Sequence, residues 1–492
     1  MPLPCRTFAA APAAILHWLR EFESRNVTFI ESDGSWPIVW ERAKGVFVWD
    51  ARGRRYLDLT AAFGVAAAGH ANPNVVKAGQ RQMGRLLHAM GDVHPHARKA
   101  ELACELSSLT FGRWMAARGT QSSAKTIFCN SGFEAVEAAF KTALLATGKS
   151  GVIAFAGAYH GLGYGALNVT HRDFFRRPFH LQLRRFGHFV PYPKAREIYD
   201  LRPPLKRDRF TIYASHDRRM AARATGFPGR GIREPCHLVS YKALDEIESR
   251  IRRLLRSGRI GAILVEPIQA RGGIIVPPQE YLPLLRYLCD EHGALLIADE
   301  IYTGFGRTGK WFACEHGGVV PDLICLGKAL AGGFPLSACV GRADLMDTAW
   351  PQSRGEAIHT STFLGHPVGC AMALAQIAEI DRAELCSRAA ELGKFLLEAL
   401  AGLRSSRFKL EARGLGLMAG LELNLPNGKP AGAATFEVIK QMLRRGYILL
   451  PEGAHGNVIS FTPPLTIGKN QLAETVRTLA EVLHSGKFKT KH

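Results

Sequence analysis

No apolar run in this sequence approaches the roughly 20 residues that a helix needs to cross a bilayer. Residues 7–19 are mildly apolar, but Pro12 and His17 interrupt them, and only Arg6 precedes them as a charged residue. We interpret this stretch as an N-terminal arm, with a secretory signal as the alternative. The sequence therefore predicts a soluble, cytoplasmic protein without membrane contact.

Cysteines at metal-binding or redox spacing are also missing. The ten cysteines are scattered along the chain, and none forms a C-x-x-C motif. A disulfide framework and a zinc site are therefore not expected, and we predict no metal site. Reduced thiols in a cytoplasmic protein are the simplest interpretation.

Acidic residues are few: 43 Asp and Glu face 63 Lys and Arg, which gives a net charge of +20. The excess is concentrated in residues 172–233, where 16 basic residues face 5 acidic ones. Such a patch can attract nucleic acid, anionic lipid or an acidic partner, whereas the alternative is a solvated surface insertion. No nucleic-acid-binding motif accompanies the charge, so we favour an insertion at about residues 172–235 and consider nucleic-acid binding unlikely on these grounds.

Strands and helices alternate through the middle of the chain. Short apolar segments predict strands at 125–129, 151–155, 262–265, 294–298, 323–326 and 336–340, and helical spacing is found at 133–147, 241–255 and 279–292. This alternation predicts a large α/β domain with a mostly parallel sheet over residues 71–345. After residue 345 helices come first and strands follow, which predicts a smaller α+β domain over residues 346–492. We expect residues 1–70 to form an arm and part of that smaller domain.

The lysine that directly follows the apolar segment 323–326 is unusual, because its ammonium group is costly to remove from water. Lys328 either reaches solvent or is buried, and burial lowers the pKa of an amine and frees its lone pair for Schiff-base chemistry. Gly327, Gly332 and Gly333 allow the backbone to approach a bound group closely. We interpret Lys328 as the covalent attachment point of pyridoxal phosphate.

Three further residues at predicted strand ends fit this interpretation. Asp299 ends a buried strand, and a carboxylate beside a protonated pyridine nitrogen keeps that ring an electron sink; capping of a loop is the alternative. Ser131 lies at a helix start, where free N–H groups form an anion site, or where a serine is an ordinary N-cap. Tyr159 follows residues 151–155 and can stack on a planar cofactor or belong to the core.

Together these motifs closely resemble the class III pyridoxal-phosphate aminotransferases, which include ornithine, acetylornithine and 4-aminobutyrate aminotransferases. The resemblance is carried by Asn-Ser-Gly at 130–132, Tyr-His-Gly at 159–161, Glu-Pro-Ile-Gln at 266–269, and the segments 298–309, 326–333 and 361–363. It implies a pyridoxal-phosphate-dependent transferase of fold type I, with pyridoxal 5'-phosphate as cofactor. It also implies an obligate homodimer with shared active sites.

The resemblance further implies a role for each matching position. Lys328 would carry the cofactor and move the substrate proton, and Asp299 would pair with the pyridine nitrogen. The other implied cofactor contacts are to the phosphate and the two ring faces: Ser131, Gly132, Phe133, Tyr159, Ile301 and Thr362. The last of these would reach the phosphate in the neighbouring subunit.

The chain departs from the family at the positions that select the substrate. Arg271 stands where members specific for amino acids have a Glu, and Ser460 stands where they have the Arg that binds the α-carboxylate. We therefore expect the usual carboxylate site to be missing. Arg271 either binds a carboxylate from another direction or pairs with a local acid. Phe63 would line the substrate pocket and favour an apolar or amine-type group, and Tyr302 replaces the Gln of ornithine-type members.

These observations predict a transaminase that takes an amino group from an amino acid, ω-amino acid or amine and passes it to a 2-oxo acid by a ping-pong mechanism. An aminomutase or decarboxylase of the same family is the alternative. A binding role of the basic region is a third hypothesis, and it predicts salt-sensitive binding that survives the loss of Lys328.

Overall fold

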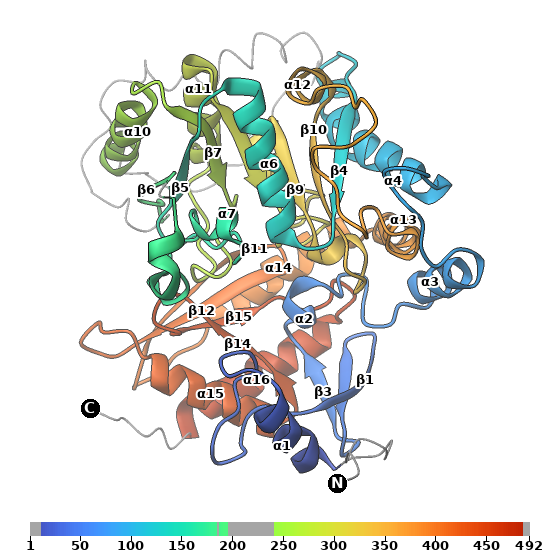
Figure 1. Ribbon diagram of the computed structural model, residues 1–492. Helices are drawn as coiled ribbons and strands as arrows, with labels where there is room; N and C mark the ends of the chain where they lie inside the picture. Colours follow the sequence, from blue (N-terminus) through green and yellow to red (C-terminus); the bar gives the residue numbers. More distant parts are fainter. Residues whose placement is uncertain (1–10, 185, 195–240, 486–492) are drawn as a thin grey trace, which may run out of the picture.

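The computed structural model describes residues 11–184, 186–194 and 241–485, and most of the basic segment therefore lies outside the described residues. Within these residues the largest sheet has seven strands, in the order β4-β10-β9-β8-β7-β5-β6 (Figure 1). The strands are β4 (Ala124–Cys129), β5 (Gly151–Phe155), β6 (Gly187–Val190), β7 (Ile260–Val265), β8 (Leu295–Asp299), β9 (Leu323–Leu326) and β10 (Ser337–Arg342). Strands β6, β5, β7, β8 and β9 pair in parallel, and β10 pairs antiparallel with β9 and β4. The predicted α/β fold with a mostly parallel sheet is confirmed.

Helices cover both faces of this sheet, because alternate side chains along each strand point to opposite sides. Val152 and Ala154 of β5 share a core with α6 (Gly132–Thr147), whereas Ile153 and Phe155 share a core with α10 (Tyr241–Leu255) and α11 (Tyr281–His292). The strands are apolar on both sides, as is typical of a parallel sheet between two helical layers.

The other helices lie around this sheet and its edges (Figure 1). They are α3 (Pro73–Arg85), α4 (Ala97–Ser107), α5 (Arg113–Ala116), α7 (Tyr164–Leu167), α8 (Asp173–Arg176), α12 (Ala343–Ala349) and α13 (Pro367–Arg382). Helix α13 packs against α3 and α4. None of the described helices combines the length and the apolar character that spanning a membrane requires.

Two four-stranded sheets lie below the large sheet in Figure 1. The first contains β1 (Trp40–Lys44), β2 (Phe47–Asp50), β3 (Arg55–Asp58) and β13 (Tyr447–Ile448), and the second contains β11 (Lys409–Leu415), β12 (Met418–Asn424), β15 (Val458–Phe461) and β14 (Leu450–Glu452). Helices α1 (Pro12–Phe22), α14 (Leu385–Ala401), α15 (Gly432–Arg444) and α16 (Lys469–Ser485) accompany them. Since Tyr447 of β13 pairs with Leu57 of β3, the N-terminal strands share a sheet with the C-terminal part of the chain.

Strand β6 lies inside the segment that the sequence analysis expected to be an insertion. It lies within residues 172–235, but it pairs in parallel with β5 and forms the edge of the large sheet. A four-residue edge strand gives almost no apolar periodicity, so the sequence pattern did not reveal it. Residues 187–190 therefore belong to the large sheet, and residues 195–240 lie outside the described residues.

Candidate active site

A cavity of about 420 Å³ opens at the carboxyl ends of the parallel strands. Its lining includes Tyr159 beyond β5, Glu266 directly after β7, Asp299 at the end of β8 and Lys328 just beyond β9. Ligands of open α/β sheets bind at this edge, because neighbouring strand ends bring distant parts of the chain together there. Lys328 and Asp299, the two residues that the sequence analysis placed at the centre of the site, thus line one cavity.

Lys328 begins the short 3-10 helix η4 (Lys328–Leu330) with a φ of 39°, a left-handed conformation that costs a non-glycine residue free energy. Its Nζ lies 4.0 Å from the centre of the Tyr302 ring. Burial lowers the pKa of Lys328 to about 8, although the negative charges of Asp299 and Glu266 oppose this shift. A larger fraction of this amine is therefore neutral, and nucleophilic, than of an ordinary lysine near neutral pH.

Asp299 is held by two hydrogen bonds. Its Oδ2 lies 2.7 Å from Nδ1 of His160, and its Oδ1 accepts a hydrogen bond of 3.1 Å from the backbone N–H of Ile301. Both side chains of the Asp299–His160 pair are buried, and Nε2 of His160 has no hydrogen-bond partner among the described residues. The sequence analysis gave His160 no role, although it lies in the Tyr-His-Gly motif.

Glu266 was also missed as a member of the site. One carboxylate oxygen accepts the backbone N–H of Tyr159 at 2.9 Å, and the other accepts that of Ala270 at 3.1 Å. Burial raises the pKa of Glu266 to about 7, opposed by His160 and supported by the negative charge of Asp299. This carboxyl group joins the segments after β5 and β7, and so fixes two walls of the cavity.

The start of helix α6 forms another wall, through Gly132 and Phe133. Glu134 accepts the backbone N–H groups of Asn130 at 2.7 Å and of Ser131 at 3.2 Å, which defines the helix start. The hydroxyl of Ser131 is buried without a hydrogen-bond partner among the described residues. The first N–H groups of a helix lack partners within the helix, so this end can bind an anion.

The wall beside Tyr159 carries opposite charges. The guanidinium carbon of Arg271 lies 5.0 Å from the centre of the Tyr159 ring, and its Nε lies 3.7 Å from Oε2 of Glu452 on β14. Burial raises the pKa of Glu452, and the positive charge of Arg271 opposes that shift. Arg271 thus lines the cavity and also has a local acid as a neighbour.

Three residues expected at the site do not line the cavity of this chain: Ser131 lies beside it, and Phe63 and Thr362 lie apart from it. The Phe63 ring is 50% exposed and does not line it, and Thr362 is on the surface. Phe63 belongs to α2 (Ala61–Gly64), in which residues 61–63 have φ values of 47°, 49° and 62°. The next residue, Gly64, packs against Tyr302, since a Cβ atom there would lie only 2.9 Å from Cε1 of that ring.

The described residues fit pyridoxal phosphate. An amine with a lowered pKa and a buried carboxylate line one cavity, and a helix start with an unsatisfied hydroxyl lies beside it. Ile301 packs against Gly132, because a Cβ atom on this glycine would lie 3.0 Å from the Ile301 side chain. An apolar side chain is thus placed between the carboxylate and the anion-binding helix end.

Comparison with known proteins agrees with this geometry. The model of the family "Aminotransferase class-III" matches residues 29–483. The chain is 35% identical to 5-aminovalerate aminotransferase DavT of Pseudomonas aeruginosa over 90% of its own length and 93% of that protein. It is 32% identical to a leucine/methionine racemase of Thermococcus litoralis over 91% of its own length and 90% of that protein.

A solved structure of similar sequence is the pyridoxal-phosphate-bound amine transaminase from an uncultivated Pseudomonas species. It superposes with a TM-score of 0.76 at 28% identity and covers 94% of this chain and 98% of its own. The family match spans nearly the whole described chain. This chain therefore belongs to the class III aminotransferases, which are enzymes dependent on pyridoxal phosphate.

Proposed function

We propose that this enzyme is a ping-pong transaminase that moves an amino group from an amine or ω-amino acid to a 2-oxo acid. The observation that carries the proposal is the presence of Lys328, with its lowered pKa, in one cavity with the buried Asp299. When bound, pyridoxal phosphate supplies an electron sink for the carbon that loses its proton. The protein's own residues hold the cofactor, orient the substrate and move protons.

Lys328 would hold the cofactor through its Nζ, and this amine, with its lowered pKa, would take up and return the proton of the substrate carbon. Asp299 would lie opposite the ring nitrogen, and the bonds from His160 and Ile301 hold its carboxylate in place. The hydroxyl of Ser131 and the N–H groups of Gly132 and Phe133 would bind the phosphate. Tyr159 and Ile301 would contact the ring.

The substrate preference follows from the charges in the cavity. Ser460 is buried in β15 and has no charge with which to bind an α-carboxylate. Arg271 lines the cavity and can bind a carboxylate with its planar guanidinium. The relatives named for 5-aminovalerate and for amines support donors without an α-carboxylate.

The main alternative is a reaction with a single substrate, such as an aminomutase or decarboxylase reaction, and the racemase among the relatives gives this class weight. Half-reactions separate the two. A transaminase consumes the absorbance of the bound cofactor aldehyde when an amine is added alone, and a 2-oxo acid restores it. An enzyme of the alternative class turns over repeatedly without any 2-oxo acid, and that result would refute the proposal.

The same experiment includes Lys328→Ala. Loss of both the attachment point and the proton carrier should lower turnover by at least about 10²–10⁴-fold, the usual contribution of a positioned acid–base group. The variant should still bind the cofactor noncovalently, since the phosphate contacts remain. Turnover at the wild-type rate would remove Lys328 from the mechanism.

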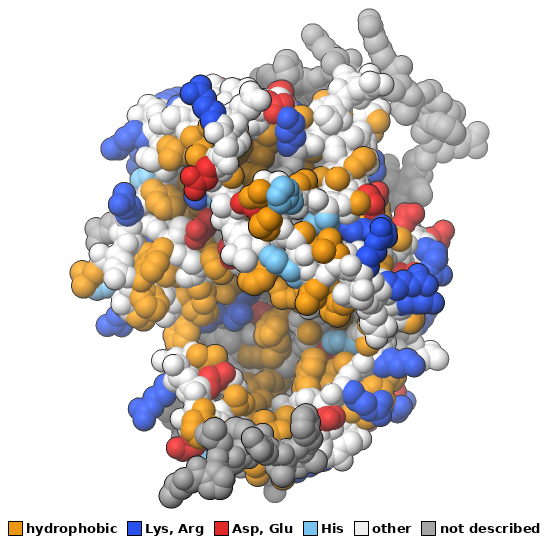
Figure 2. Space-filling view, turned by 45° about the vertical axis from the view of Figure 1, so that its right-hand side comes forward, with side chains coloured by type: hydrophobic (Ala, Val, Ile, Leu, Met, Phe, Trp, Pro, Cys, Tyr) orange, Lys and Arg blue, Asp and Glu red, His pale blue; other side chains and the backbone are white. Residues whose placement is uncertain are grey.

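We further propose that the enzyme is a cytoplasmic homodimer and that Thr362 reaches the partner's cofactor phosphate. Large hydrophobic side chains are exposed at Met83, Leu86, Leu87, Met90, Val93, Ile358 and Phe363. Figure 2 shows hydrophobic side chains gathered around a hollow on one face of the molecule. Apolar patches of this kind mark protein interfaces. Sedimentation of the holoenzyme tests the dimer, and an active monomer would contradict it.

A further inference from the structure

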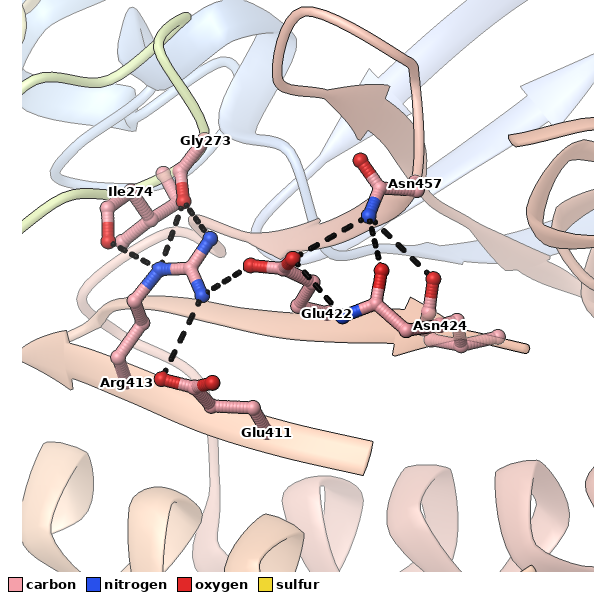
Figure 3. Close-up of polar contacts among 8 residues, drawn as sticks. Gly273, Ile274, Glu411, Arg413, Glu422, Asn424 and Asn457 are labelled. Atoms are coloured by element: carbon pink, nitrogen blue, oxygen red, sulfur yellow. Dashed lines mark hydrogen bonds and ion pairs between the residues drawn. The ribbon is translucent and has the colours of Figure 1, made fainter. Parts of the chain in front are cut away.

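Two arginines meet the turn that follows β7, and they are held very differently. Arg413 of β11 donates to the carbonyl oxygen of Gly273 at 2.7 and 3.0 Å and to that of Ile274 at 3.1 Å (Figure 3). It also bonds Glu422 at 2.5 Å, a carboxylate to which Asn424 and Asn457 donate as well. Arg413 is therefore committed to fixing the turn.

Arg271, which begins the same turn, has no comparable set of partners. Its Nε has no hydrogen-bond partner among the described residues, and the same holds for Oε2 of Glu452. These two atoms lie 3.7 Å apart, beyond the 2.7–3.2 Å of a normal N–H···O hydrogen bond. Two charges brought together without hydrogen bonds recover little of the free energy that their desolvation costs.

A second guanidinium acts on the same wall. That of Arg172 lies 5.5 Å from the ring centre of Phe175, and the Phe175 ring lies 5.5 Å from that of Tyr159. Partial burial lowers the pKa of Arg172, and so does the positive charge of Arg271, whereas Glu452 opposes the shift. Two guanidinium groups thus act on one carboxylate here, which leaves an excess of positive charge beside the cavity.

We propose that Arg271 is the receptor for a substrate carboxylate and that Glu452 is its exchangeable counter-ion. When a substrate with a carboxylate enters, that group replaces Glu452 as the partner of Arg271, and the charge of Arg172 favours the exchange. When an uncharged amine enters, Arg271 stays with Glu452. The enzyme thereby accepts both classes of donor. This inference rests on the proposed function and makes Glu452 a specificity-determining residue.

The test uses two donors of equal chain length, 5-aminovalerate and pentylamine, with the holoenzyme. The donor half-reaction is followed without any 2-oxo acid, because the acceptor also carries a carboxylate. In Arg271→Gln the half-saturating concentration of 5-aminovalerate should rise about 10–100-fold, the worth of hydrogen bonds to a charged group, and this rise should far exceed any change for pentylamine. In Glu452→Gln the half-saturating concentration of 5-aminovalerate should fall, because the competing carboxylate is gone. Arg271→Lys should be intermediate, since an ammonium cannot bind a carboxylate in two places.

Arg445→Gln and Glu481→Gln serve as matched controls. They change the same charges in an ion pair of 3.3 Å at the surface, and neither should discriminate between the donors. A second measurement does not depend on turnover: glutarate, which has carboxylates but no amino or oxo group, should bind more weakly to Arg271→Gln and more tightly to Glu452→Gln.

Equal effects of Arg271→Gln on both donors, or a raised half-saturating concentration of 5-aminovalerate in Glu452→Gln, would identify a permanent structural pair and overturn the inference. Unchanged glutarate binding in both variants would do the same. If pentylamine is transaminated normally while the variants show no selectivity, this inference fails and the proposed function stands. If no transamination occurs, the glutarate measurement still decides the role of Arg271.

Discussion

The charged side chains on two walls of the cavity differ in how firmly they are bonded: Asp299 on one wall, and Arg271 with Glu452 on the other. Asp299 makes hydrogen bonds of 2.7 Å to His160 and of 3.1 Å to the backbone N–H of Ile301. Arg271 and Glu452 face each other at 3.7 Å, with unsatisfied atoms on both sides. A group that must keep one charge throughout a reaction benefits from preorganised bonds, whereas a group that exchanges partners must not be bound too firmly.

The difference follows from where the residues come from. Asp299 ends β8 and pairs in register with Cys325 of β9, so the sheet itself brings Asp299 close to Lys328. Arg271 follows β7, but Glu452 comes from β14 of a different sheet. Contacts within one sheet are fixed by the ladder of backbone hydrogen bonds, and contacts between sheets are not. We call the wall that contains Asp299 and His160 the firm wall. Its contacts are the more predictable ones, because the order of strands in one sheet sets them.

Removing the charge of the firm wall should have the largest effect. Asp299→Asn should lower kcat by about 10²–10³-fold, since it removes a preorganised charge opposite the ring nitrogen. It should also lower the pKa of Lys328 below its value of about 8, because the carboxylate favours the ammonium form. The pH dependence of the reaction between apoenzyme and pyridoxal phosphate measures that shift.

Asp322→Asn is the control for this prediction. Asp322 is a buried carboxylate paired with Arg286 and Arg342 beyond the cavity lining, so its loss should reduce stability without moving the pH profile. Equal pH profiles for Asp299→Asn and the wild type would show that the firm wall does not set the charge of Lys328.

His160 offers a smaller perturbation: its ring lines the cavity, and its Nδ1 lies 2.7 Å from Oδ2 of Asp299. His160→Ala removes one hydrogen bond to a charged group, which is worth about 1.5–3 kcal/mol, so kcat should fall about 10–100-fold. Steady-state kinetics with a single amino donor measures this loss. The ring of His316 contacts Thr308 outside the cavity lining, so His316→Ala should leave kcat unchanged.

The sequence predicted correctly those parts of the site that the order of strands in the large sheet brings together. The apolar segments at 151–155 and 323–326 coincide with β5 and β9, and Lys328 and Asp299 meet as expected. Sequence patterns could not identify Glu452 as the neighbour of Arg271, because this pair depends on how two sheets pack. The position of Phe63 depends on a left-handed run of backbone, which no apolar periodicity indicates.

Tyr302 lies between the two walls and should show the smallest effect. Its hydroxyl bonds Oγ1 of Thr462 at 3.1 Å, and burial raises the pKa of Tyr302 to about 12, so the phenol stays neutral throughout the working pH range. Tyr302→Phe keeps the ring beside Lys328 and loses one neutral hydrogen bond, worth about 0.5–1.5 kcal/mol, or about 2–10-fold in kcat. Thr462→Val removes the same bond from the other side.

The double variant of Tyr302 and Thr462 decides what the hydroxyl does. If its only role is to hold the ring against Thr462, the two single effects should not add, because each variant already breaks the shared bond. A double variant as slow as the product of the two single effects would mean that the phenol acts on the substrate or on Lys328 directly. Tyr302 would then act in the reaction itself, as Lys328 and Asp299 do. The pair of Arg271 and Glu452 would no longer be enough to explain the enzyme's choice of substrate.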